Sequence, residues 1–123
     1  MAKRKLVFVV DDDDSMLRSI KRLLTGHGFN ARVFDSGTAL LGQDDFDEAF
    51  CIILDINLND QSGIDLRTKL AAQGVAAPVI FITGDDTPAK RSAAIRSGCI
   101  AYLTKPFSAR SLIEPITLAF AAA

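Results

Sequence analysis

Leu6-Val-Phe-Val-Val10 runs directly into Asp11-Asp-Asp-Asp14, so five apolar residues are followed at once by four acids. Two further apolar runs of strand length are Phe50-Cys-Ile-Ile-Leu54 and Pro78-Val-Ile-Phe-Ile82. Each run is continuous rather than alternating. Continuous runs are typical of strands buried on both faces, as in a parallel sheet covered by helices.

Weaker apolar runs and helical segments complete the pattern. Residues 31–34 and 100–103 are predicted to form outer strands. A first helix carries apolar residues at helical spacing from Met16 to Leu24, with Asp14 or Ser15 as its N-cap and Gly26 or Gly28 at its end. Further helices are predicted near 36–42, 64–73, 88–97 (stopped by Gly98) and 109–122, with Ser108 as the cap of the last.

Strands and helices therefore alternate, which predicts an α/β fold: a doubly wound, five-stranded parallel sheet with five helices. The 123 residues fit one domain, taken as residues 1–123. Hydrophobic residues make up 49% of the chain and charged residues 24%, which is ordinary for a globular protein.

Charge and cysteine content exclude several classes of function. The formal net charge is −1 and no basic stripe is visible, so direct nucleic-acid binding is not expected. No apolar run approaches the roughly 20 residues that span a bilayer, and a cytoplasmic location is expected. Cys51 and Cys99 lack metal-ligand spacing and His27 is the only histidine, so buried free thiols are predicted rather than a zinc site.

Polar residues follow each predicted inner strand and the last outer one. They are Asp11 to Asp14, Asp55, Thr83 and Lys105. Singly, an acid run can be a helix cap, a lone Asp a turn former and a lone Lys a solvated side chain. Together they are predicted to meet at one edge of the sheet, because the carboxyl ends of parallel strands lie there.

A pocket that gathers Asp11, Asp12 and Asp55 favours a cation. Two carboxylates about 4 Å apart repel by roughly 4 kcal/mol at an effective dielectric near 20. Oxygen ligands suit Mg²⁺, whereas Zn²⁺ prefers His or Cys. A carboxylate beside Mg²⁺ can act as a nucleophile toward a phosphoryl group, and a Lys and a Thr hydroxyl can hold the phosphoryl oxygens.

At these residues the chain resembles the response-regulator receiver family, the group that contains CheY and FixJ. The resemblance extends along the whole chain. It is carried by these segments: Val9-Val-Asp-Asp12, Ile53-Leu-Asp-Ile-Asn-Leu58, Ser62-Gly63 with Asp65-Leu66, Phe81-Ile-Thr-Gly84, and Gly98 with Tyr102-Leu-Thr-Lys-Pro-Phe107. It implies a flavodoxin-like sheet in the order 2-1-3-4-5.

The resemblance also implies the role of each residue. Asp55 accepts a phosphoryl group from a sensor histidine kinase or a phosphotransfer protein. Mg²⁺ is held by Asp55, by Asp12 directly, by Asp11 through a water and by the backbone carbonyl of Asn57. Thr83 and Lys105 hold the phosphoryl oxygens, and the Lys105–Pro106 peptide bond is cis.

The same resemblance implies a switch. Thr83 moves toward the phosphoryl group, Tyr102 swings inward, and the face formed by helix 4, strand 5 and helix 5 meets an output partner or forms a phosphorylation-dependent dimer. Asn57 and Asp85 flank the path of the hydrolytic water, so their polar side chains predict a labile phosphoryl group. The protein is thus expected to be a phosphoacceptor switch, not an enzyme.

Some positions depart from the family pattern. Asn59 stands where the family usually carries Pro, so a looser loop is expected after Asp55. Asp13 and Asp14 leave open which acids contact the metal. Pro115 falls inside the last predicted helix, where Pro costs about 3 kcal/mol, so this helix is expected either to kink or to begin later.

Two other functions fit parts of the sequence. A haloacid-dehalogenase-like phosphatase would use Asp11 of Asp11-x-Asp13-x-Ser15 as nucleophile, but it needs an acidic pair after Lys105, where only Glu114 follows. The other alternative is a receiver-like module that binds partners without being phosphorylated.

Overall fold

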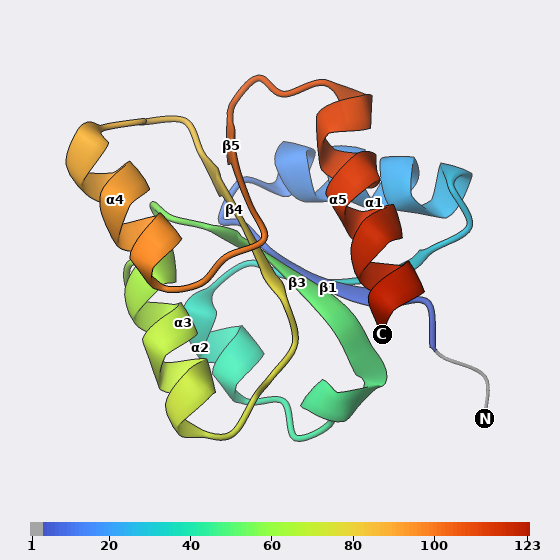
Figure 1. Ribbon diagram of the computed structural model, residues 1–123, viewed down its shortest axis with the longest axis horizontal. Coiled ribbons are helices and arrows are strands. Elements are labelled where there is room, and N and C mark those ends of the chain that lie inside the picture. The colour runs from blue at the N-terminus through green and yellow to red at the C-terminus, as the bar shows by residue number, and fades with distance from the viewer. Residues whose placement is uncertain (1–3) are drawn as a thin grey trace.

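The computed structural model describes residues 4–123 and shows the predicted architecture. Five parallel strands lie in the order β2-β1-β3-β4-β5, and helices cover both faces of the sheet (Figure 1). None of the helices formed by these residues combines the length and the apolar composition that a membrane span requires.

The helices and strands follow the predicted alternation and differ from the predicted bounds only at their ends, and a short 3-10 turn before β3 is an addition that was not predicted. In chain order they are β1 (Leu6–Val10), α1 (Asp14–Gly26), β2 (Asn30–Phe34), α2 (Gly37–Leu41), a 3-10 turn (Phe46–Glu48), β3 (Ala49–Asp55), α3 (Gly63–Ala72), β4 (Val79–Thr83), α4 (Pro88–Arg96), β5 (Ala101–Thr104) and α5 (Ala109–Ala122).

Burial on both faces explains why the sequences of β1, β3 and β4 are continuous apolar runs. Every residue of β1, β3 and β4 is buried, whereas the outer strands β2 and β5 are partly exposed. Alternate residues of the inner strands enter two separate cores. Phe8 and Phe81 pack on the side of α2, α3 and α4, and Val9 and Ile53 pack on the side of α1 and α5 (Figure 1).

Helix ends follow capping chemistry, with one correction. Ser108 caps α5 as predicted, with its hydroxyl accepting the N–H of Ser111. The cap of α1 is Asp13, not Asp14 or Ser15: its carboxylate accepts the N–H and the hydroxyl of Ser15. Neighbouring acids offer the same acceptor, so only the backbone at Asp13, which is extended, decides which one caps.

Pro115 lies within α5, which begins at Ala109 and continues to Ala122. The alternative of a later helix start is therefore wrong. The Ser108 cap fixes the first turn, and the buried side chains of Leu112 and Ile116 hold the helix against the sheet on both sides of the proline.

The two cysteines are free. Cys51 is buried in β3, and this burial raises the pKa of its thiol to about 12. Cys99 is only half-buried, so the prediction that both thiols are buried is wrong for this residue. Its position just before the partly exposed edge strand β5 explains the difference.

The loop after β3 is anchored by Asp60, next to the Asn59 that replaces the family's proline. The Asp60 carboxylate accepts the N–H of Gly37 at 3.2 Å, the N–H of Thr38 at 2.9 Å and the hydroxyl of Thr38 at 2.7 Å. These bonds satisfy the first turn of α2 and lower the pKa of Asp60 to about 2. An isolated bridge between Asn57 and Ser62 closes the same loop.

Asp60→Ala is expected to lower the free energy of unfolding by about 1 kcal/mol at neutral pH, the usual cost of losing a capping side chain. The pKa of Asp60 in the folded chain is about 2, below its value of about 4 in an unfolded chain. Its contribution is therefore complete above about pH 4 and is lost as the pH falls through about 2. Urea unfolding between pH 7 and pH 2.5 measures this.

The matched control is Asp44→Ala, which removes an exposed acid just after α2. The control is expected to change stability little. An Asp60→Ala penalty that stays constant as the solution is acidified would contradict a contribution from the ionised carboxylate.

Candidate functional site at the carboxyl edge of the sheet

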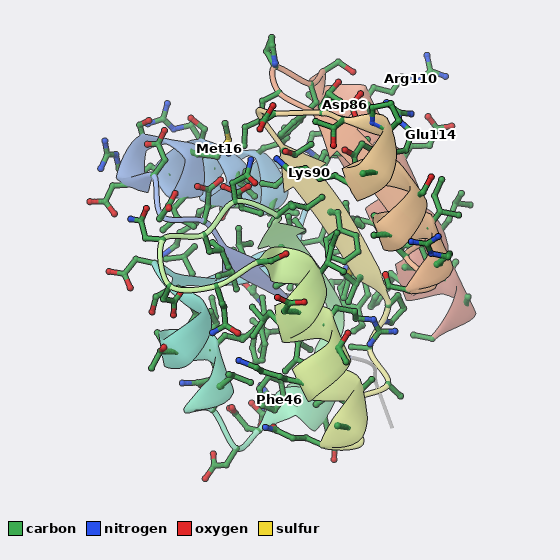
Figure 2. All side chains as sticks on the ribbon, turned by 90° about the vertical axis from the view of Figure 1, so that its left-hand side faces the viewer. Met16, Phe46, Asp86, Lys90, Arg110 and Glu114 are labelled. Carbon is green, nitrogen blue, oxygen red and sulfur yellow. The ribbon has the colours of Figure 1, made fainter. Side chains whose placement is uncertain are left out.

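The predicted polar residues meet where the strands end. Asp11 and Asp12 follow β1, Asp55 ends β3, Thr83 ends β4, and Lys105 follows β5. One carboxylate oxygen from each of Asp11, Asp12 and Asp55 lies within 4.8 Å of the other two. In Figure 2, Met16 and Lys90 lie toward this end of the molecule and Phe46 lies at the opposite end.

The Lys105 ammonium lies between two buried carboxylates. Its Nζ is 2.8 Å from Asp11 Oδ2 and 3.2 Å from Asp55 Oδ2. Asp11 is fully buried and Asp55 is 4% exposed. The other oxygen of each acid accepts a backbone N–H, from Asp13 for Asp11 and from Asn57 for Asp55. Both carboxylates are thus fixed in orientation by the chain that follows their strands.

Burial and charge act in opposite directions on these groups. Burial, followed by the negative charge of Asp11, raises the pKa of Asp55 to about 6, although the Asn57 N–H and Lys105 act to lower it. For Lys105, burial lowers the pKa, but the hydrogen bond to Asp11 and the charge of Asp55 outweigh it and raise the pKa above its ordinary value. The cluster thus contains one ammonium group, that of Lys105, and three carboxyl groups, the third being that of the half-buried Asp12.

The donor set fits Mg²⁺. The cluster of possible metal ligands among residues 4–123 contains aspartate oxygens only, without His or Cys. Hard oxygen donors are the ligands that Mg²⁺ takes, usually with one or two carboxylates and several waters. An added divalent cation also compensates the excess negative charge at this edge.

Thr83 and Asn57 lie beside the acids and are joined to each other. The Thr83 hydroxyl, which is fully buried, accepts the N–H of Asp85 at 3.1 Å and the Nδ2 group of Asn57 at 3.4 Å. The predicted switch hydroxyl is therefore bonded to residues on both loops that border the cluster. Asn57 contacts Asp55 through its backbone and Thr83 through its side chain.

Asp85 and Tyr102 contact other partners than the acid cluster. The Asp85 side chain is 71% exposed and pairs with Lys90 of α4 at 2.8 Å. The Tyr102 phenol donates to Asp86 at 2.7 Å at the protein surface. The Lys105–Pro106 peptide bond is cis, as the family resemblance implied.

Four residues that contribute to the structure around this edge were not among the site residues predicted from the sequence. Gly63, at the start of α3, packs so tightly that a methyl group built on it would overlap the carbonyl of Asp55. Asp60, Asp86 and Arg91 make contacts that join separate elements. The Ser62-Gly63 pair was a usable signal for a tight helix start. The contacts of Asp60 with Thr38 and of Asp86 with Tyr102 join residues 22 and 16 positions apart, and the Arg91–Asp86 pair spans five positions, outside the i,i+3 and i,i+4 spacing of a helix face.

The geometry also bears on the dehalogenase-like alternative. That hypothesis takes Asp11-x-Asp13-x-Ser15 as the nucleophile motif, with Asp11 as the nucleophile. The Asp13 carboxylate instead caps α1 through Ser15 and Met16. Hydrogen bonds from the same two residues, with Ser15 contributing most, lower the pKa of Asp13.

Comparisons with known proteins agree with this arrangement. The family model described as "Response regulator receiver domain" matches residues 7–117. The chain is 33% identical over 117 residues to response regulator protein TmoT of Ectopseudomonas mendocina, covering 95% of this chain and 53% of that protein. It is 34% identical over 116 residues to nodulation protein W of Bradyrhizobium diazoefficiens, covering 94% and 51%.

A solved structure gives the same result for the fold. The receiver domain of Francisella response regulator 1452 superposes with a TM-score of 0.84 at 28% identity, covering 95% of this chain and 97% of that one. The chain spans about half the length of the curated relatives it matches. The matched residues include all five strands except Leu6, the first residue of β1, and they include the whole acidic edge; the chain therefore belongs to the response-regulator receiver family of two-component systems.

Proposed function

We propose that Asp55 accepts a phosphoryl group from a phosphohistidine of a sensor histidine kinase or phosphotransfer protein, in a Mg²⁺-dependent reaction. The observation that carries this proposal is the position of the Asp55 carboxylate, hydrogen-bonded to Lys105 and clustered with Asp11 and Asp12. TmoT, of which this chain spans about half the length, is a response regulator, which supports a kinase as donor and an output partner or domain downstream.

The transfer needs one nucleophile and no external oxidant. A carboxylate oxygen of Asp55 forms a bond to phosphorus while the bond from phosphorus to the donor imidazole breaks, and the imidazole nitrogen then takes up a proton. The product is an aspartyl phosphate. Lys105, already 3.2 Å from Asp55, would pair with a phosphoryl oxygen, and Thr83 would hydrogen-bond another.

Asp12, Asp11 and Asn57 would hold the metal with Asp55. Asp12 would bind it directly, Asp11 through a water, and Asn57 through its backbone carbonyl. When bound, Mg²⁺ supplies positive charge that offsets the negative phosphoryl oxygens. Asp11 and Asp55 are held in place by the N–H groups of Asp13 and Asn57, so the chain itself orients two of the carboxylates.

An output partner would bind to the domain at the α4–β5–α5 face. Three large apolar side chains are exposed there: Ile95 at 62%, Ile100 at 44% and Leu118 at 67%. Movement of Thr83 toward the phosphoryl group, with Tyr102 swinging inward, would repack this face toward an output partner or a second copy. The role is that of a switch rather than a turnover enzyme, and the receiver family assignment leaves no support for a dehalogenase-like phosphatase.

The proposal predicts that the chain acquires the mass of one phosphoryl group when incubated with Mg²⁺ and acetyl phosphate. Asp55→Asn is expected to acquire none, because the amide is not a nucleophile toward phosphorus. Intact-mass measurement of both proteins is the test. An unchanged wild-type mass with a folded protein would favour the passive binding module.

A second prediction concerns the lifetime of the phosphoryl group. Asn57 and Asp85 both bond to the Thr83 hydroxyl, Asn57 through its side chain and Asp85 through its backbone N–H, and their polar side chains are proposed to admit the hydrolytic water. After removal of the donor, Asn57→Leu and Asp85→Leu are expected to lose the added mass several-fold more slowly than wild type. Asp44→Leu is the control on the surface. A wild-type lifetime of many hours would contradict this role.

A third prediction concerns the metal alone. A ligand present at about ten times its Kd stabilises a protein by ~1.4 kcal/mol. Thermal unfolding with Mg²⁺ is therefore expected to show clear stabilisation of wild type and much less of Asp55→Asn. In chelator, Asp55→Asn is expected to unfold at a higher temperature than wild type, because the variant no longer buries two carboxylates around one ammonium. Equal stabilisation of both proteins by Mg²⁺ would contradict Asp55 as a ligand.

A further inference from the structure

Asp86, Arg91 and Tyr102 form a closed network on the surface beside the site. The Tyr102 hydroxyl donates to Asp86 Oδ1 at 2.7 Å, and Arg91 Nη2 donates to Asp86 Oδ2 at 2.7 Å. The Arg91 guanidinium also lies over the Tyr102 ring, 4.9 Å from its centroid. Each of the three side chains therefore contacts both of the others, and they come from the β4–α4 loop, α4 and β5.

The network differs from an ordinary surface ion pair. An isolated exposed pair contributes little, because two long side chains lose freedom to form it. Here one carboxylate uses both oxygens, and a cation–π contact adds to the two charged hydrogen bonds. Hydrogen bonds from Arg91 and Tyr102 also lower the pKa of Asp86, so its charge persists at neutral pH.

The same loop connects the network to the switch hydroxyl. Asp85, the neighbour of Asp86, donates its N–H to the Thr83 hydroxyl and pairs through its carboxylate with Lys90, the neighbour of Arg91. Figure 2 shows Asp86 and Lys90 near the first turn of α4. Because the Thr83 hydroxyl oxygen accepts the Asp85 N–H, displacement of that oxygen pulls on Asp85, and a movement of Thr83 can thus reach the network through two adjacent loop residues.

We propose that Asp86 and Arg91 form a latch that holds Tyr102 outward and opposes the switch, so that this pair sets how readily Asp55 is phosphorylated. The proposal rests on the proposed function. Inward rotation of Tyr102 takes its hydroxyl from Asp86 and its ring from beneath Arg91. Contacts present in only one of two states bias the equilibrium toward that state by their own free energy.

The test compares rates of phosphorylation by acetyl phosphate with Mg²⁺, read by intact mass. Asp86→Ala and Arg91→Gln are expected to react faster than wild type, by about two- to tenfold for contacts of this size. Because the contacts form one network, the double variant is expected to react no faster than the faster single variant. Arg96→Gln is the control, since it makes the same change of charge at the last residue of α4.

Tyr102 also reports the latch without any phosphodonor. It is the single tyrosine of the chain, which has no tryptophan, so all tyrosine emission comes from this residue. A hydrogen-bonded carboxylate quenches phenol emission. Asp86→Ala is therefore expected to emit more strongly than wild type, and beryllofluoride with Mg²⁺ is expected to raise the emission of wild type but not of Asp86→Ala.

Two results would overturn the latch while leaving the phosphoacceptor role intact. One is a wild-type rate in both variants, and the other is a slower rate, which would mean that the contacts favour the switched state. Circular dichroism of each variant establishes that it is folded. A wild-type chain that takes up no phosphoryl group would contradict the proposed function instead, and the latch would then have nothing to oppose.

Discussion

The contact between the Lys105 ammonium and the carboxylates of Asp11 and Asp55 is the interaction on which the rest of the site depends. Burying one ionised carboxylate is costly, and burying two close together is more so unless a positive charge is fixed beside them. The single Lys105 ammonium compensates only part of the negative charge of the two carboxylates. The pKa of Asp55 remains raised, which marks a site held in a state that favours the arrival of further positive charge.

The parallel sheet makes that contact possible. β1 and β3 are neighbours in register, with Val10 opposite Leu54, so the acids that follow them end at one level. Lys105 reaches them from beyond β4, and its backbone N–H bonds to the Thr83 carbonyl at 2.8 Å, which fixes the start of its side chain. Residues separated by about 50 and 94 positions in sequence thus meet because strand order brings their ends together.

Sequence alone predicted the parts of this protein that depend on local pattern. The continuous apolar runs predicted β1, β3 and β4, and the polar residues after them predicted the acidic edge. It failed where equivalent groups compete or where partners are distant. Asp13 and Asp14 offer the same cap, and only the backbone conformation selects Asp13. The bonds of Asp60 to α2 and of Tyr102 to Asp86 depend on loop paths that no periodicity encodes.

The close packing of Gly63 makes the two sides of the site mechanically unequal. The first turn of α3 rests on the main chain of Asp55, and the Gly63 N–H bonds to the Ile56 carbonyl at 2.8 Å. There is no free space there for relative displacement. The β4–α4 loop has no such close packing: a methyl group built on Gly84 would meet its nearest neighbour, Lys105 Cδ, only at 3.8 Å. A displacement arising at Asp55 is therefore blocked toward the first turn of α3 and has room toward the β4–α4 loop, which gives the domain a direction of response.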